Sequence, residues 1–189
     1  HDMPMLARSY GSSGFTNDGY ILLNDRYDIW KVDLSGKEKA VRITSDGREN
    51  KTTYRILTLN RKKIYVDLKV KNLARSFNES SKESGLIHLL PNKGKKVLVE
   101  SNHSYSYPVK SRNADMVYWT KSNFKTYPDI YISDLSFNNP MKISDQGKQL
   151  NEYKWGNVQL VKWTSFSGEE LEGLLYTPEN IDKSKKYPM

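Results

Sequence analysis

The sequence contains no cysteine and three histidines, His1, His88 and His103. The absence of thiols excludes disulfides, cysteine nucleophiles and zinc–thiolate sites. No two histidines stand four residues apart, and neither an aspartate-rich calcium loop nor a glycine-rich phosphate loop is present in the sequence. We therefore predict no metal site and no cofactor.

The sequence also lacks the Gly-x-Ser-x-Gly pattern of a nucleophile elbow. The stretch Gly11-Ser12-Ser13-Gly14 has the wrong spacing and follows no apolar strand. His88 lies in an apolar run, which is typical of a packed imidazole, and His103 lies in a predicted turn. Because a hydrolase needs a nucleophile, a base and an oxyanion stabiliser together, we predict no catalytic residue in this chain.

Long apolar runs are absent too, and nothing approaches the roughly 18 residues that cross a bilayer, so we predict no membrane span. The first five residues do not have the charged and then apolar pattern of a signal peptide, and the first residue is not methionine. We expect the chain to be a segment of a longer protein, and favour a periplasmic or secreted location for that protein over the cytoplasm.

The charge is unbalanced, with 30 Lys and Arg against 22 Asp and Glu and a formal net charge of +8. The basic residues are spread over several predicted turns, and no basic helix or RNA-binding aromatic motif accompanies them. This distribution favours a solvated surface, and we predict no nucleic-acid partner.

Aromatic residues are abundant, since they make up 12% of the chain and include 13 Tyr and 4 Trp. Alanine is scarce, and no stretch sustains an apolar period of 3.6 residues. Short apolar runs instead end in turn-forming residues, as at 20–23, 28–34 and 41–44. This pattern predicts an all-β fold.

An internal repeat organises these runs. Residues 28–35 match residues 129–136 at an offset of 129 − 28 = 101, and residues 41–43 match residues 141–143 at an offset of 100. With one weaker unit between the copies, the repeat is about fifty residues long, which is close to the length of a propeller blade. We predict a partial β-propeller of about three blades, each a four-stranded antiparallel sheet; the alternative is a β-sandwich.

The weaker middle unit has predicted strands at 63–66, 86–90 and 97–99. Its polar segment 73–85, LARSFNESSKESG, is predicted to be an insertion that forms a helical turn or stays mobile. Beyond the repeat, residues 158–166 and 170–176 predict one longer hairpin. We place a domain boundary at 155–157, which divides the chain into residues 1–157 and residues 158–189.

The last stretch, VQLVKWTSFSGEELEGLLYTPENIDKSKKYPM, resembles the domain junction of prolyl oligopeptidase family serine peptidases, particularly the dipeptidyl-peptidase and acylaminoacyl-peptidase-like branch. In that family a β-propeller is followed by an α/β-hydrolase domain, which opens with such a hairpin. The segments DRYDIWKVDLSG and VRITSDG resemble the family's blades. The positions that carry the junction motif are Phe166, Gly168, Gly173, Tyr176, Pro178, Tyr187 and Pro188.

The resemblance implies that the parent protein is a serine exopeptidase or oligopeptidase that cleaves short peptides. The propeller would control substrate access, and the catalytic serine, aspartate and histidine would lie beyond Met189. Glu169 and Glu170 lie in the hairpin, so the family's amine-binding role is not assigned to them. The chain alone is expected to associate with itself through exposed edges.

Two other functions stay open at this point. One is a peptide- or protein-binding β-propeller of a non-enzymatic periplasmic protein. The other is a purely structural β-domain. The reading frame beyond Met189 would distinguish them from the peptidase.

Overall fold

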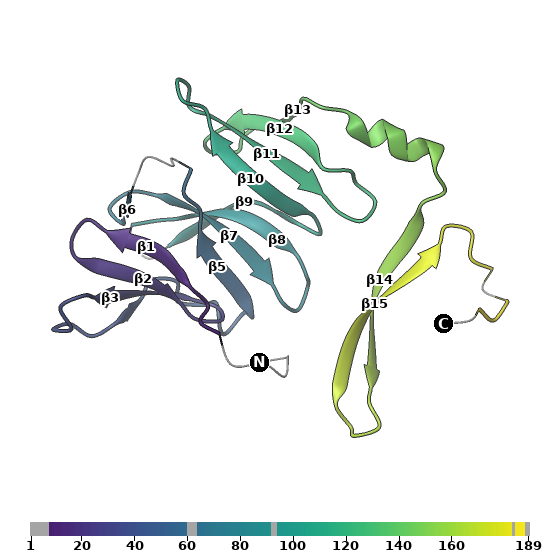
Figure 1. The fold of residues 1–189 in the computed structure, drawn as a ribbon, viewed down its shortest axis with the longest axis horizontal. Helices are drawn as coiled ribbons and strands as arrows, with labels where there is room; N and C mark the ends of the chain where they lie inside the picture. Colours follow the sequence, from purple (N-terminus) through teal and green to yellow (C-terminus); the bar gives the residue numbers. More distant parts are fainter. Residues whose placement is uncertain (1–7, 60–63, 92–93, 183, 188–189) are drawn as a thin grey trace.

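A computed structural model describes residues 8–59, 64–91, 94–182 and 184–187, and these residues form an all-β fold (Figure 1). The predicted fold class is confirmed at this level. Three sheets, which we name the first, middle and third sheet, follow one another along the chain, and a separate two-stranded hairpin comes after them. In every sheet the strands that are consecutive in the chain pair in antiparallel fashion, because short turns connect them.

The first sheet has the strand order β4-β3-β2-β1-β6. The middle sheet has the order β5-β7-β8-β9, and the third has the order β10-β11-β12-β13. The strands of the first sheet are β1 (Ser12–Thr16), β2 (Tyr20–Asn24), β3 (Ile29–Asp33), β4 (Val41–Arg42) and β6 (Tyr65–Val66). Those of the middle sheet are β5 (Thr52–Ile56), β7 (Asn72–Asn78), β8 (Ser84–Leu89) and β9 (Lys95–Ser101). Those of the third sheet are β10 (Ser104–Lys110), β11 (Met116–Ser122), β12 (Asp129–Asp134) and β13 (Met141–Lys142).

The first copy of the repeat forms the outer half of the first sheet. Asp28, which immediately precedes β3, is fully buried, and its carboxylate accepts hydrogen bonds from the Thr44 hydroxyl at 2.8 Å and the Gly47 N–H at 3.0 Å. The Ile29 N–H donates in turn to the Thr44 hydroxyl oxygen. Arg42 also forms an ion pair with Asp28, at 3.4 Å, and the Arg48 N–H donates to the same carboxylate at 3.3 Å. One buried carboxylate therefore fixes the strand and the turn that follows it.

The second copy builds the same corner in the third sheet. Asp129 is buried and accepts hydrogen bonds from the Ser144 hydroxyl at 2.6 Å and the Gln146 N–H at 2.8 Å. The Ile130 N–H donates to the Ser144 oxygen, and Lys142 forms an ion pair with Asp129 at 2.8 Å. The predicted equivalence of the two segments is confirmed, since each forms a strand in the same hydrogen-bonded setting.

The predicted insertion at 73–85 is wrong. This segment supplies most of β7, the turn after it and the start of β8, which pair along their whole length in the middle sheet. The reason is that both faces of the middle sheet are covered. Neighbouring residues such as Leu73 and Ala74 point to opposite faces and are both buried, so the strand does not need the simple alternation that marks a one-sided strand.

The predicted strand at 63–66 is assigned to the wrong sheet. Residue 63 lies outside the described residues, and β6 pairs with β1 of the first sheet in parallel fashion, through Phe15 with Tyr65 and Thr16 with Val66. The connection between β5 and β7 thus adds a fifth strand to the neighbouring sheet. Val66 is buried there, which explains why so short a strand is retained.

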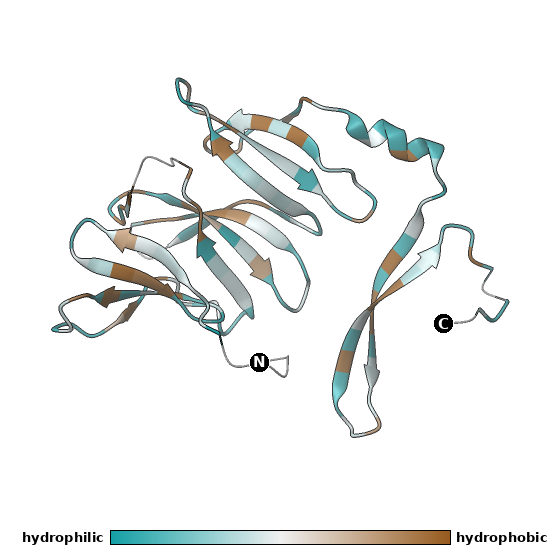
Figure 2. Ribbon diagram, in the orientation of Figure 1, coloured by the Kyte–Doolittle hydropathy of each residue, from teal (hydrophilic) through white to brown (hydrophobic). Residues whose placement is uncertain are grey.

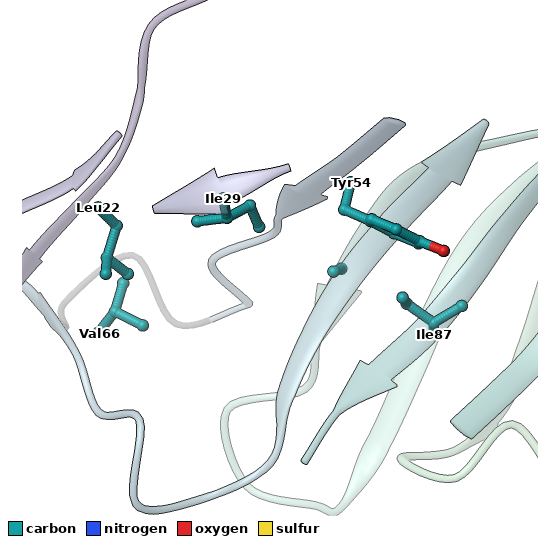
Figure 3. Close-up of a cluster of buried hydrophobic side chains, with 6 residues drawn as sticks. Leu22, Ile29, Tyr54, Val66 and Ile87 are labelled. Atoms are coloured by element: carbon teal, nitrogen blue, oxygen red, sulfur yellow. The ribbon is translucent and has the colours of Figure 1, made fainter. Parts of the chain in front are cut away.

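Two hydrophobic cores lie between the three sheets. Figure 2 marks the apolar segments of the strands in brown. The core between the first and middle sheets, drawn in Figure 3, consists of Leu22, Ile29, Tyr54, Val66, Ala74 and Ile87. The core between the middle and third sheets consists of Leu73, Leu86, Tyr105, Val117, Trp119 and Phe137. The middle sheet therefore supplies residues to both cores, and each of its two faces contributes to one core.

After the third sheet, a 3-10 helix, η1 (Gln146–Glu152), leads to the hairpin of β14 (Gly156–Thr164) and β15 (Glu170–Pro178). Figure 1 shows the hairpin beside the stacked sheets rather than within them. Within the described part of the chain, no helix has the length and apolar character needed to cross a membrane.

Candidate functional site at the hairpin junction

The hairpin carries most of the predicted junction motif. Nine residue pairs join β14 to β15, from Gly156 with Pro178 at the base to Thr164 with Glu170 near the tip. Gly168 lies in the tip with a φ of 85°, a left-handed conformation that favours glycine. Its N–H donates to the Ser165 carbonyl at 3.0 Å. The connection therefore depends on glycine at this position of the motif.

Gly173 makes room for an aromatic side chain in the middle of the hairpin. It pairs with Val161, and a Cβ atom at this position would lie 3.0 Å from the Trp163 ring. The indole of Trp163 therefore lies across the glycine, on the same face of the hairpin as Leu171, its directly opposite partner. The motif thus specifies an aromatic surface as well as a turn.

The base of the hairpin contacts the third sheet through an aromatic group. The Phe124 ring, in the loop between β11 and β12, lies 5.3 Å from the Tyr176 ring and 5.9 Å from the Trp155 ring. The Trp155 indole N–H donates to the Phe124 carbonyl at 2.6 Å, and Lys125 donates to the Asn157 amide oxygen at 2.5 Å. These contacts join the predicted boundary, residues 155–157, to the preceding sheet.

A charged contact joins the hairpin to the middle sheet. Glu172 lies 2.6 Å from the Lys82 ammonium and 2.8 Å from the Lys162 ammonium. The hydrogen bond from Lys162, followed by that from Lys82, lowers the pKa of Glu172 to about 2. Lys82 lies in the turn between β7 and β8, so this ion pair spans two separate sheets.

The apolar residues of the hairpin are divided between its two faces. Leu174 and Tyr176 share one face with Leu160, and Leu171 lies on the other face with Trp163. The register therefore separates Leu171 from Leu174 and Tyr176, although all three belong to the same strand. All five side chains remain exposed. A two-stranded hairpin is marginally stable in water by itself, so both faces are surfaces on which a partner can pack.

The remaining motif positions lie apart from this surface. Phe166 projects from the tip and is fully exposed. Tyr187 follows the hairpin, and its hydroxyl oxygen accepts a hydrogen bond from the Asp182 N–H at 3.0 Å. Pro188 lies outside the described residues. The structure thus gathers Gly173, Tyr176 and Pro178 on β15 and leaves Tyr187 in the segment after it.

Among the described residues, one serine lies within hydrogen-bond distance of a histidine. The Ser101 hydroxyl lies 2.9 Å from His103 Nδ1 and 2.8 Å from the Tyr105 hydroxyl, while His103 Nε2 lies 3.5 Å from the Thr126 hydroxyl. Burial, followed by the charge of Lys121, lowers the pKa of His103. No carboxylate among the described residues orients this imidazole, so the triad arrangement is not formed.

Ser13 and His88 have structural surroundings rather than a catalytic arrangement. Ser13 donates to the Asn24 side chain at 2.9 Å. His88 is buried in the middle sheet, and burial lowers its pKa. In the described part of the chain, no group of three or more His, Asp or Glu side chains could hold a metal ion.

Sequence reasoning missed the residues that anchor the hairpin. Phe124 and Lys82 come from turns of two different sheets, and each meets a residue far away in the chain. Nothing in their local sequence distinguishes them from other exposed aromatic or basic residues. Only the arrangement of the sheets brings them to the hairpin.

Solved structures of the isopeptidase AtxE2 have a similar fold. A serine-to-alanine variant with Astexin3-dC4 bound matches 87% of this chain and 24% of that chain, with a TM-score of 0.56 and 14% identity. The apo form matches 93% of this chain and 26% of that chain, with a TM-score of 0.53 and 10% identity. This chain spans about a quarter of the length of these isopeptidases. No family model and no curated protein sequence matches it.

At these identities the likeness concerns the fold alone. The chain has a fold similar to part of these isopeptidases, and its own activity has to be argued from its residues. The described residues provide three packed sheets and a two-faced hairpin, and they provide no complete nucleophile, base and oxyanion stabiliser.

Proposed function

We propose that this chain is a non-catalytic β-propeller segment of a larger serine peptidase that cleaves short peptides. The three sheets would be consecutive blades, and the hairpin would be the start of an α/β-hydrolase domain. In this proposal the catalytic serine, aspartate and histidine belong to the hydrolase domain beyond Met189. The blades would limit access to that domain to short peptides.

The hairpin is the observation that carries the proposal. It has apolar side chains on both faces, including Leu174 on one and Trp163 on the other, and both are exposed. Exposed apolar surface of this extent is typical of an interaction site. The similar isopeptidase folds, of which this chain covers about a quarter, support the same interpretation.

The repeated corner supports the blade interpretation. The four antiparallel strands β1 to β4 of the first sheet and the four strands of the third sheet carry a buried aspartate at the same position. The four antiparallel strands of the middle sheet lie between them. Regular repetition of one meander is what a propeller requires. The sequence that follows the hairpin provides the most direct test of the proposal.

The experiment compares the 189-residue chain with the protein encoded by its full reading frame. We expect a fluorophosphonate probe to label one serine of the full protein, in a Gly-x-Ser-x-Gly sequence about one hundred residues after Met189. We expect no labelling of the 189-residue chain and no cleavage of chromogenic dipeptides or tripeptides by it. Ser101→Ala is the control, because Ser101 is the serine that contacts an imidazole.

Two results would overturn the proposal. Stoichiometric labelling of Ser101, Ser12 or Ser13 would mean that the chain has its own nucleophile. A full reading frame without a hydrolase sequence, together with peptide binding by the chain, would instead favour a non-enzymatic binding propeller.

A further inference from the structure

The middle sheet carries a polar cleft of about 300 Å³ that the proposed function does not use. Its floor is one end of the face that contacts the first sheet. Two rows of side chains cross this face, as the strand register requires. The first row is Thr52, Asn78 and Glu83, and the second is Tyr54, Ser76, Gly85 and Glu100.

Ser76 is the unusual member of the second row. It is 4% exposed, and its hydroxyl oxygen is buried without a hydrogen-bond partner among the residues that the structure describes. The hydroxyl lies over Gly85, where a Cβ atom would approach it to 2.7 Å. Burying a hydroxyl that has no hydrogen-bond partner costs free energy. The position of Ser76 at the cleft therefore indicates a ligand group that would form the missing hydrogen bond.

The charges around this hydroxyl are negative. Glu83 and Glu100 both line the cleft, and neither forms an ion pair with a described residue. Glu100 lies opposite Gly85, and Glu83 lies two residues before Gly85, so the register puts both carboxylates on one face as diagonal neighbours. A cation bound between the two side chains would be attracted by both negative charges.

The basic residue of the cleft is already paired. Lys95 donates to the Asp46 carboxylate and to the Tyr54 hydroxyl, and its ammonium also lies 4.7 Å from the centre of the Tyr54 ring. Lys95 is therefore paired with Asp46 and not with Glu83 or Glu100. The local negative charge of these two glutamates stands out in a chain whose formal net charge is +8.

The apolar part of the cleft completes the description of the ligand. Ile87 and Val97 are opposite one another in the next row and line the cleft beside the polar rows. Figure 3 shows Ile87 and Tyr54 together on this side of the sheet. A ligand with a cationic head and a short aliphatic stem matches this arrangement, because the head would meet the carboxylates and the stem would meet the apolar residues.

We propose that the cleft binds a primary alkylammonium group. The ammonium would donate to Glu83, Glu100 and the Ser76 oxygen, and its methylene stem would lie on Ile87 and Val97. Such a group comes either from a free aliphatic diamine or from a lysine side chain of a peptide or protein. The site is separate from the hairpin, so this proposal does not rest on the proposed peptidase function.

The first test is a calorimetric titration of the 189-residue chain with 1,5-diaminopentane, and with 1,5-pentanediol as the uncharged match. We expect the diamine to bind with a dissociation constant on the order of 1 mM, as suits so small a ligand. The diol should not bind measurably. Equal binding of the two compounds, or no binding of the diamine, would overturn the proposal.

Variants connect the binding to the named residues. Glu100→Gln and Glu83→Gln should each weaken diamine binding by roughly tenfold, because each removes a charged acceptor. Ser76→Ala should weaken binding by a few-fold while leaving the chain folded, because it removes a hydroxyl that has no partner. Glu169→Gln, in the exposed hairpin tip, is the control and should bind as the unmodified chain does. An unchanged affinity in the Glu83/Glu100 double variant would disprove the assignment.

A second pair of ligands distinguishes the two sources of the ammonium group. Nα-acetyl-lysine amide presents a lysine side chain, and the same compound acetylated at Nζ presents the stem without the charge. Binding of the first compound but not the second would point to a lysine of a peptide or protein. Binding of the diamine but not of Nα-acetyl-lysine amide would point to a free amine.

Discussion

The two copies of the buried-aspartate corner build the same turn from different residues. In the first copy, Gly36 takes the left-handed position after β3, with a φ of 71°. In the second copy Phe137 takes that position with a φ of 59°, although this conformation is unfavourable for a bulky residue. Phe137 is buried, and its ring lies 4.8 Å from the Trp119 ring. In the second corner the backbone of Phe137 is therefore strained, but its side chain is buried in the core.

The copies also differ in how tightly each turn packs on its aspartate. A Cβ atom at Gly47 would lie 2.6 Å from the Asp28 carboxylate, whereas one at Gly147 would lie 3.2 Å from that of Asp129. The first corner therefore depends on close backbone approach, and the second depends on side-chain burial. The same fold is specified in two physically different ways, and four experiments test this difference.

The largest effect is expected from removing the carboxylates. Asp28→Ala leaves the Thr44 hydroxyl and the Gly47 N–H buried without an acceptor, and should lower the free energy of unfolding by about 3 to 4 kcal/mol. Asp129→Ala should cost less, about 2 kcal/mol, because Lys142 is 40% exposed and can return to water. Urea denaturation of both variants measures the difference, and equal losses would contradict it.

The next largest loss of stability is expected at the two residues with a positive φ, Phe137 and Gly36. Phe137→Ala removes a buried ring and should lower the free energy of unfolding by about 3 kcal/mol. Gly36→Ala, at the equivalent exposed position, adds only the strain of a positive φ and should cost about 1 kcal/mol. Thermal unfolding of the two variants gives the ranking. A larger loss for Gly36→Ala would mean that the second corner does not rely on its core anchor.

Smaller effects are expected at the two turn glycines. Gly47→Ala would bring a methyl group against the Asp28 carboxylate and the Thr52 carbonyl, at 2.6 and 2.7 Å, and should cost about 2 kcal/mol. Gly147→Ala requires the neighbouring atoms to move by only a few tenths of an ångström. It should lower the free energy of unfolding by less than about 1 kcal/mol. Chemical denaturation of the pair, measured side by side, checks the contrast; similar values would show that both turns can relax.

The smallest effect is a pH dependence in the second corner. Burial of Asp129 favours a higher pKa, but hydrogen bonds from Lys142, Ser144 and the Gln146 N–H outweigh it and lower the pKa to about 2. Because the folded-state pKa lies below the ordinary value of 3.8, the carboxylate stabilises the fold above about pH 4. This stabilisation is lost as the pH falls through about 2.

Asp129→Asn provides the comparison for this effect. The denaturation midpoint of the unmodified chain should fall more steeply between pH 5 and pH 2 than that of the variant. Parallel curves would show that Asp129 does not contribute to the acid sensitivity. The measurement isolates one carboxylate, because the other acidic residues are common to both proteins.

The repeat was the part of the fold that sequence alone could predict. Asp28 and Asp129 stand at the beginning of equivalent strands. The repeat was visible because an aspartate, an apolar strand and a turn follow one another in the same order in both copies. Residues 73–85 were misassigned because a strand buried on both faces shows no alternation to detect. The pairing of Tyr65 and Val66 with β1 was also missed, since two residues carry too little pattern to identify their partner.

The candidate site was predicted in its local features and missed in its contacts. The segments 158–166 and 170–176 indicated a hairpin, and the structure contains one with nine residue pairs. The contacts of Tyr176 with Phe124 and of Glu172 with Lys82 depend on how separate sheets are arranged. The same is true of the polar cleft, whose residues come from all four strands of the middle sheet.

The parallel pairing of β6 with β1 has a consequence for how this chain can be divided. In chain order β6 lies between two strands of the middle sheet, yet it completes the edge of the first sheet. The units of the sequence repeat and the units of the structure therefore do not coincide here. A cut or circular permutation between β4 and β5 would separate the first sheet from its fifth strand, so these two repeats are not interchangeable modules.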